Sequence, residues 1–135
     1  IDMLSESVLL YTFSAMQYNL ADEEKQKENA GLVSKIRKYV DDNFSDPDIS
    51  LELISKKYSY NKKYVSTAFK NQMNIGFSQY LNTIRIQNAC SLMAEGFTCI
   101  KDIAYMCGFT DQMYFSKVFK KQKKLTPSQF IALMK

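Results

Sequence analysis

The sequence contains no histidine and has only four glycines and two prolines among its 135 residues. Without histidine, the chain cannot use imidazole as a general base, form Ser-His or Cys-His nucleophilic sites, or bind zinc through imidazole ligands. The scarcity of glycine and proline argues against a turn-rich sandwich or barrel and favours helices. Hydrophobic residues make up 46 %, which is enough for a packed core and argues against disorder.

The three cysteines, Cys90, Cys99 and Cys107, are an odd number and form no Cys-x-x-Cys motif. This argues against a disulfide framework or a zinc ribbon, and favours reduced thiols that fill apolar space in a core. A glycine-rich phosphate loop and a ligand cluster are also lacking, and the adjacent Asp41 and Asp42 are typical of a solvated helix end. The sequence therefore predicts neither a catalytic nor a metal site, and no cofactor.

The longest apolar stretch, residues 8–16, is interrupted by Thr12 and Ser14 and is too short to cross a bilayer. No basic segment precedes it, so it does not resemble a secretory signal. We therefore expect a cytoplasmic protein with no membrane partner. Because the chain starts at Ile1 rather than Met, we also expect it to be a piece of a longer protein.

Charge divides the chain into two parts. Residues 1–30 hold six acidic and two basic side chains, whereas residues 31–135 hold eight acidic and 16 basic ones. The formal net charge of +4 therefore conceals an acidic beginning and a basic remainder. This pattern indicates an acidic linker in front of a basic module, and polyanions are expected among the partners of a basic helical module.

The acidic part begins with an apolar band that predicts a helix over residues 5–21. The polar segment 22–30 then predicts a linker that ends at Gly31. The helix either packs on the rest of this chain or is the last helix of an upstream domain, where it could form a homodimer. We expect residues 1–30 to be the end of that upstream domain and residues 31–135 to be a separate domain.

From Leu32 onward, apolar residues recur at helical spacing, and the first of these helices is expected to end at Asp46 and Pro47. Ser50 and Asn61 are plausible N-caps, and Thr126-Pro127-Ser128-Gln129 is a capping box with proline at the first helical position. Gly96 is placed to end a long helix. The predicted helices cover residues 51–58, 62–71, 77–95, 100–106 and 111–121, with a last one starting at 126.

The second half of the chain repeats the first. Residues 64–81 and 114–131 are identical at seven of 18 aligned positions, and five of the eleven differences exchange one apolar residue for another. Further upstream the offset falls from 50 to 49, so the second unit has one extra residue in its turn. A short helix, a tight turn and a longer helix that repeat with this period predict two tandem helix-turn-helix units, at 50–71 and 100–121, joined by the helix 77–95.

The second helix of each unit has an apolar face and an opposite face rich in lysine and hydroxyl groups. The opposite faces carry Lys63, Ser66, Thr67 and Lys70 in the first unit, and Met113, Ser116, Lys117 and Lys120 in the second. Lysine can contact guanine or phosphate, the amide of Gln112 can pair with adenine, and the Met113 side chain suits a thymine methyl group. The alternative is a lysine face that contacts only solvent.

The length of the joining helix is compatible with two DNA grooves. Its 19 residues span roughly 28 Å, and successive major-groove segments on one face of B-DNA lie about 34 Å apart. Two recognition helices fixed to such a rod could enter adjacent segments, with some DNA bending. Phosphates would be met by helix N-termini and by lysines, namely Lys56, Lys57, Lys62, Lys120, Lys121, Lys123 and Lys124.

Residues 31–135 resemble the C-terminal DNA-binding domain of AraC/XylS-type bacterial transcription regulators. The second unit carries the more specific signature, and the joining helix also fits. The residues that carry the resemblance are Ile103-Ala104, Cys107-Gly108-Phe109, Asp111-Gln112, Tyr114-Phe115-Ser116, Val118-Phe119-Lys120, Pro127-Ser128, Tyr80-Leu81-Asn82, Ile84-Arg85-Ile86 and Ala89. In the first unit, Ser59 stands where the second unit has Gly108, and Ser55 stands where it has Ala104, so a left-handed turn residue costs more in the first unit.

The resemblance implies an all-α fold of seven helices, contact with two major-groove segments of double-stranded DNA, and control of transcription through RNA polymerase. It also implies that Arg85 connects the two halves rather than contacting DNA. The positions that would face bases or phosphates are Lys62, Lys63, Ser66 and Thr67, then Asp111, Gln112, Met113, Ser116 and Lys117. The competing interpretation is a helical protein-interaction or dimerisation module without DNA binding, which would lack the steep salt dependence of a DNA-binding protein.

Overall fold

The computed structural model describes the backbone of residues 2–135 and the side chains of residues 20–135. Its elements, within that range, are seven helices and no strand. They are α1 (Asp2–Asn43), α2 (Leu51–Lys57), α3 (Lys62–Met73), α4 (Phe77–Ala94), α5 (Ile100–Met106), α6 (Gln112–Lys123) and α7 (Pro127–Met134). The predicted all-α fold, with two helix-turn-helix units joined by a linker helix, is confirmed.

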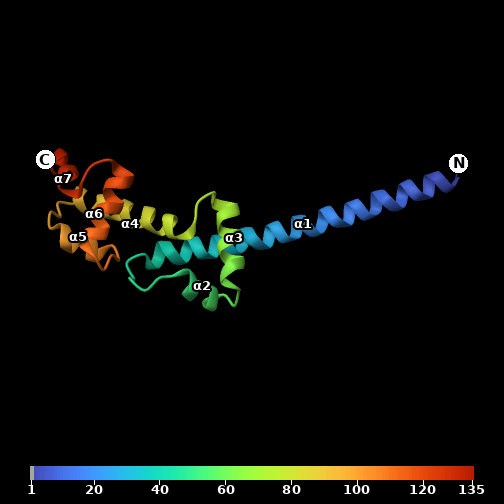
Figure 1. Ribbon diagram of the computed structural model, residues 1–135, viewed down its shortest axis with the longest axis horizontal. Coiled ribbons are helices and arrows are strands. Elements are labelled where there is room, and N and C mark those ends of the chain that lie inside the picture. The colour runs from blue at the N-terminus through green and yellow to red at the C-terminus, as the bar shows by residue number, and fades with distance from the viewer. Residues whose placement is uncertain (1) are drawn as a thin grey trace.

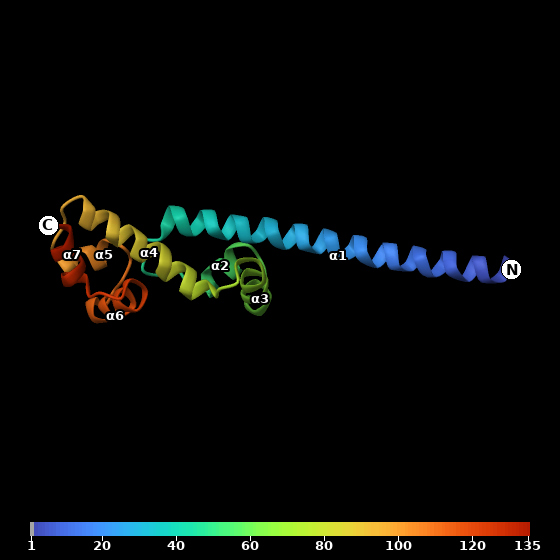
Figure 2. The same ribbon diagram turned by 90° about the horizontal axis from the view of Figure 1, so that it is seen from above.

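The two units lie at either end of α4, and α1 is a long rod that extends past the first unit toward the N-terminus (Figures 1 and 2). Helices α2 and α3 form the first helix-turn-helix, and α5 and α6 form the second. The C-terminal part of α1 lies against the first unit, whereas its N-terminal part projects away from the rest of the molecule in both views.

The predicted linker at residues 22–30 is wrong, because α1 is one continuous helix through this segment and through Gly31. A polar segment is excluded from a core but not from a helix, and glutamate, lysine and glutamine are good helix formers. Glu23 and Lys27 also have the spacing that stabilises an exposed helix. Gly31 costs about 1 kcal/mol relative to alanine, which the burial of Leu32 and Val33 directly after it can offset.

The helix expected over residues 5–21 is present as part of α1. Its apolar band, on which the expected dimerisation depends, lies outside the described side chains, apart from the exposed Leu20. That expectation therefore stays a prediction.

The core of the first unit is formed by α1, α2, α3 and the first turns of α4. Its fully buried side chains are Ile36, Val40, Ile54, Val65 and Phe69. The ring of Phe69 meets Phe77 and Tyr80 of α4 edge to face, with ring centroids 5.8 and 5.4 Å apart. The start of α4 is thereby part of the first unit.

The core of the second unit is formed in the same way by α4, α5, α6 and α7. Its fully buried side chains are Ile86, Ala89, Ile103, Cys107, Phe115 and Phe119. Phe130 of α7 meets Phe119 edge to face at 5.4 Å. The repeat thus includes the helix before each unit, since the buried positions Val33, Ile36 and Val40 of α1 recur 53 residues later as Ile86, Ala89 and Met93 of α4.

The predicted N-caps and the capping box are confirmed, whereas the helix expected to start at Leu32 is the continuation of α1. The Ser50 hydroxyl accepts a hydrogen bond from the Leu53 amide, and the Asn61 side chain accepts one from the Lys63 amide. The capping box at Thr126 and Gln129 is also formed. Helices α3 and α6 each end two residues later than predicted. They end where Asn74 and Lys124 adopt the left-handed conformation that often follows a helix, although neither residue is glycine.

Ser59 and Gly108, the residues compared in the two turns, both have a positive φ, of 59° and 95°. Ser59 therefore adopts the left-handed turn that glycine adopts more readily. The other departure, Ser55, is buried, and its hydroxyl donates to the Leu51 carbonyl at 2.7 Å, so the polar group is satisfied within α2. The first unit keeps the helix-turn-helix geometry despite both departures.

Candidate nucleic-acid interface

The outer face of α3 is a polar surface that no other element covers. All four of its predicted residues, Lys63, Ser66, Thr67 and Lys70, are exposed, whereas Val65, Ala68 and Phe69 on the opposite face are buried. Asn61 is the N-cap of the helix, and the apolar face of the helix packs into the core. The opposite face therefore points outward. Two ammonium groups and two hydroxyl groups are thereby available to an external partner.

The outer face of α6 has the same construction with different side chains. Met113 is 81 % exposed, and Lys117 and Lys120 are exposed as well, while Ser116 is half-buried. The buried residues opposite them are Phe115, Val118 and Phe119. A large exposed methionine at the start of a polar face is suited to contact an apolar group such as a methyl on the partner.

Asp111 and Lys62, at the starts of α6 and α3, each bind a group within this chain, which the sequence does not predict. The Asp111 carboxylate accepts a hydrogen bond from the Met113 amide at 2.9 Å and is the N-cap of α6. Gln112, beside it, is exposed. The Lys62 ammonium donates to Glu52 at 3.1 Å, and this contact lowers the pKa of the Glu52 carboxyl below its ordinary value. Part of the positive charge of Lys62 is therefore balanced within the chain.

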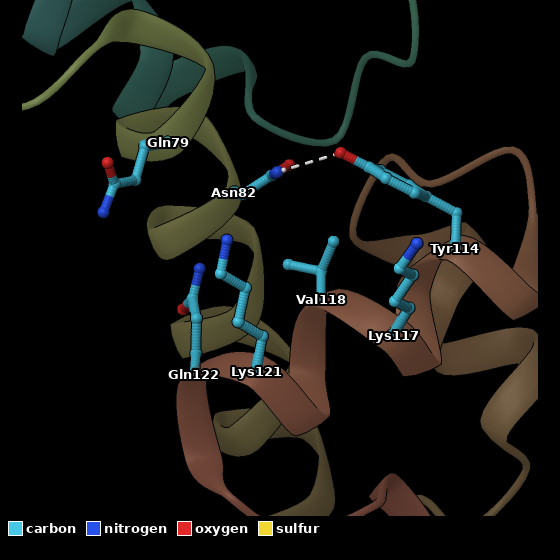
Figure 3. A pocket seen from close by; sticks show the side chains of 7 residues that line it. All are labelled: Gln79, Asn82, Tyr114, Lys117, Val118, Lys121 and Gln122. Carbon is cyan, nitrogen blue, oxygen red and sulfur yellow. Dashed lines mark hydrogen bonds between the residues drawn. The ribbon is translucent and has the colours of Figure 1, made fainter.

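Tyr114 is a surface residue that the sequence assigns to the apolar face of α6. It is 49 % exposed, and its hydroxyl accepts a hydrogen bond from the Asn82 amide of α4 at 3.1 Å. In Figure 3 the two side chains point toward one another and meet in this hydrogen bond, and both line a pocket of about 550 Å³. The pocket is lined by Gln79, Asn82, Tyr114, Lys117, Val118, Lys121 and Gln122.

A second pocket of about 520 Å³ shares Asn82 and Tyr114 with the first. It extends to Glu52 of α2 and to Lys62, the first residue of α3. We call the two pockets together the α4 groove, which runs from the start of α3 to the flank of α6. Lys62 and Lys117 line it at its two ends. Helix α3 thus contributes Lys62 to the second pocket, and α6 contributes Lys117 to the first.

The sequence contains one signal that could have identified Tyr114, namely its counterpart Tyr64. The Tyr64 hydroxyl donates to the Asn29 side chain of α1, as Tyr114 pairs with Asn82 of α4. Asn29 and Asn82 are 53 residues apart, the same spacing as the buried positions of α1 and α4. A search for the repeat upstream of residue 50 would have found both pairs.

The cysteines are all free. Cys107 is buried in the second core, where burial raises the pKa of its thiol to about 11, and Cys90 packs against that core. Cys99, however, is exposed at the N-cap of α5, so it is not the core residue that the sequence predicts. Among the residues described, no three His, Cys, Asp or Glu side chains are arranged to hold a metal ion, and no helix is long and apolar enough to span a membrane.

The fold and the two outer faces can be compared with known proteins. Residues 54–132 match the family model of a helix-turn-helix domain, which is more than half of the chain. The chain belongs to the AraC/XylS family of transcription regulators. Over 99 residues, 73 % of this chain, it is 30 % identical to YijO, an HTH-type transcriptional regulator of Escherichia coli.

Solved structures of AraC-type domains have the same fold. The C-terminal domain of AraT, a response regulator from Geobacillus stearothermophilus, is 30 % identical and has a TM-score of 0.73, with 76 % of this chain and 84 % of that one covered. The DNA-binding domain of AdpA, solved with a target DNA, has a TM-score of 0.70 over 75 % of this chain and 90 % of that one. At 16 % identity it shows the likeness of fold alone.

The chain spans less than half the length of the curated relatives that it matches, including 35 % of YijO. These relatives are transcription regulators rather than enzymes. The likeness therefore bears on the part of these relatives that this chain matches and not on their whole length.

Proposed function

We propose that this chain binds double-stranded DNA in a sequence-specific way, with α3 and α6 in successive major-groove segments, and thereby regulates transcription. The observation that carries the proposal is the repeated outer face, which presents exposed lysines from both recognition helices opposite two separate buried cores. Duplicated cores serve folding, but folding does not require the outer faces to be alike.

The dimensions of α4 support contact with two groove segments. Its 18 residues span roughly 27 Å, somewhat less than the distance of about 34 Å between successive major-groove segments on one face of B-DNA. Modest bending of the DNA toward the protein would close the difference. The α4 groove lies between the two outer faces, where Lys62, Lys117 and Lys121 supply positive charge for the intervening phosphates.

Within the outer faces, we propose different tasks for different residues. Lys63, Lys117, Gln112 and Met113 would contact base edges, because amide, ammonium and methyl-matching groups discriminate bases in the major groove. Lys62, Lys70 and Lys120 would contact phosphates, and Ser66, Thr67 and Ser116 would donate to either. Asp111 would act through its cap, since its carboxylate holds the first turn of α6.

We further propose that residues 1–30 are the end of an upstream domain, that residues 31–135 are the DNA-binding domain, and that the protein acts in the cytoplasm. RNA polymerase would be the partner through which transcription is controlled. A homodimer would form through the upstream domain or through residues 5–21.

The test is selection of bound sequences from a random duplex library, followed by anisotropy titration of the selected DNA at several salt concentrations. We expect affinity to fall steeply with salt, because each neutralised phosphate releases a counterion. Lys63→Ala with Lys117→Ala should weaken binding by about 1–3 kcal/mol for each lost base contact, with unchanged helical content.

The matched control is Lys25→Ala with Lys38→Ala, which removes the same charge from exposed positions of α1. It should leave specific binding close to that of the unmodified chain. Equal losses in the two double variants would mean that net charge, rather than the outer faces, governs binding. Selection of no sequence, together with salt-insensitive behaviour, would favour a protein-interaction module.

A further inference from the structure

The two hydrophobic cores meet on α4 without merging. Leu81 belongs to the first core and Ile86 to the second, and the buried residue between them is Arg85, which is only 7 % exposed. No apolar side chain at this point belongs to both cores. The angle between the two units therefore depends on α4 itself, which packs into both cores, and on the polar contacts that Arg85 makes beside it.

The Arg85 side chain connects three segments that are distant in the sequence. From α4, its Nε donates to the Phe44 carbonyl at 2.9 Å and its second guanidinium nitrogen donates to the Asp46 carbonyl at 2.8 Å. These carbonyls lie just past the C-terminal end of α1, where the helix dipole favours a cation. The guanidinium also lies 5.5 Å from the ring centroid of Phe109, in the turn before α6.

Gly108 shows how closely the three segments approach. A Cβ atom on Gly108 would lie 2.5 Å from the Phe44 carbonyl oxygen and 2.9 Å from Nε of Arg85. The turn that precedes α6 is thus in direct contact with the same carbonyl that Arg85 binds. We call Arg85, Gly108, Phe109 and the two carbonyls the Arg85 junction.

We propose that Arg85 is a positioning residue that fixes the angle between the two helix-turn-helix units and thereby the number of base pairs between their two half-sites. The proposal rests on the proposed function, since it assigns the spacing requirement of that DNA site. One base pair changes the separation of half-sites by about 3.4 Å and rotates one half-site by roughly 35°. A rigid junction cannot follow such a change, whereas a loosened one can.

The experiment measures affinity for selected DNA in which one or two base pairs are inserted or deleted between the half-sites. The unmodified chain should lose about tenfold or more in affinity for each change of one base pair, as expected for a rigid pair of recognition helices. Arg85→Lys keeps the charge but lacks the planar fork that binds two carbonyls, so its affinities should differ by about threefold or less across spacings. Its affinity for an isolated half-site should equal that of the unmodified chain.

The matched control is Arg37→Lys, the same exchange at the other arginine, which is exposed on α1. It should retain the full spacing preference.

A second pair of variants changes the other side of the Arg85 junction. Gly108→Ala crowds the Phe44 carbonyl, whereas Gly96→Ala has a similarly positive φ with nothing within 4 Å of the added Cβ. Only Gly108→Ala should weaken the spacing preference. If Arg85→Lys loses helical content, this pair tests whether the Arg85 junction sets the spacing preference.

An Arg85→Lys variant that folds and discriminates spacings as sharply as the unmodified chain would overturn the proposal. So would an unmodified chain that binds a selected site with equal affinity at all spacings, and in that case the proposed DNA binding would still stand. Failure to select any DNA would overturn the proposed function itself, and the positioning role with it.

Discussion

The two helix-turn-helix units share a core pattern but differ in their surroundings. In the first unit, Tyr64 contacts Asn29 of α1 and the turn is made by Ser59, which is exposed. In the second, Tyr114 makes the equivalent contact with Asn82 of α4 but is half-exposed on the α4 groove, and the turn residue Gly108 is buried against the Phe44 carbonyl. The residues that the two units share therefore set the geometry within each unit. Residues that differ between the units, such as Ser59 and Gly108, decide how closely each turn approaches other segments.

This difference has a functional consequence. The first unit is stabilised by a long helix that continues away from it, whereas the second is held near the end of α1 through the Arg85 junction. The units are related to each other through α4, which packs into both cores, and through the polar contacts of Arg85, whereas the geometry inside each unit depends on a packed core. Changes within a core and changes at the junction should thus have different effects.

The largest effect is expected from truncating the core of either unit. Phe69→Ala and Phe119→Ala, both at fully buried positions, should each lower the free energy of unfolding by about 3–5 kcal/mol. Because the cores are separate, each variant should lose amide protection mainly in its own unit. Urea unfolding and hydrogen exchange measure the two quantities.

Tyr105→Ala, at an exposed position, is the control for these core variants and should change stability by less than about 0.5 kcal/mol. Loss of protection across both units in the Phe69 variant would show that the two cores unfold as one, and the comparison between units would then lose its basis.

The next effect concerns the two turns. Gly108→Ala should destabilise the chain by about 3 kcal/mol, because it adds a backbone clash to the strain of a positive φ. Ser59→Ala should change stability by less than about 0.5 kcal/mol, since a Cβ is already present there. Thermal unfolding measures both, and a large cost at Ser59 would mean that its hydroxyl, rather than its backbone, matters to the turn.

A smaller effect should appear at alkaline pH in the second unit. Burial raises the pKa of Cys107 to about 11, above the value of about 8.5 for a free thiol. Between these values the unfolded chain releases the proton more readily than the folded chain, so the free energy of unfolding falls as the pH rises from about 9 toward 11. Cys107→Ala should weaken this pH dependence in denaturant titrations.

The exposed Cys99 supplies the control, because Cys99→Ala should leave the same alkaline slope unchanged. In the first unit the corresponding position at the end of α2 is Tyr58, and burial raises the pKa of its hydroxyl above the ordinary value of 10.0. Tyr58→Phe should therefore affect stability only at still higher pH. A slope that is the same in all variants would assign it to other groups.

The smallest effect is expected at the caps of the recognition helices. Asn61→Ala and Asp111→Ala should each cost about 1 kcal/mol, since each side chain binds the amide two residues later. Only the Asp111 cap carries charge at the helix N-terminus, so its cost should decrease at high salt while that of Asn61 does not. Thermal melts at two salt concentrations check this, with Thr110→Ala as the exposed neighbour that should have little effect.

Much of the fold could be predicted because helix starts and apolar faces depend on residues a few positions apart. Ser50, Asn61 and Thr126 each bind an amide two or three residues later, so the sequence alone reveals them. The sequence predicts a linker at residues 22–30, where the structure has a helix. Polar side chains indicate that a segment is exposed to solvent but do not indicate its backbone conformation. Its helicity depends on propensity and on the anchored turns that follow, starting at Leu32.

The candidate site was predictable to a similar extent. The exposed outer faces of α3 and α6 follow from helical periodicity, as residues such as Lys63 and Lys117 show. The α4 groove does not follow from it, because the Asn82 amide reaches Tyr114 only when α4 packs beside α6. The same holds for the ion pair between Lys62 and Glu52, which forms only because the turn brings α2 and α3 together.

The sequence by itself determined the order of the helices from residue 51 onward, the repeat and the polar faces, because local hydrogen bonds and side-chain periodicity encode them within a few residues. Tertiary structure decided that the C-terminal part of α1 packs into the first unit, and which groups Arg85 contacts where it connects the end of α1, α4 and the turn before α6. The physical reason is that an arginine in an apolar helix specifies only that its charge must be satisfied. Which carbonyls satisfy it depends on segments some forty residues away, and their approach is set by two packed cores.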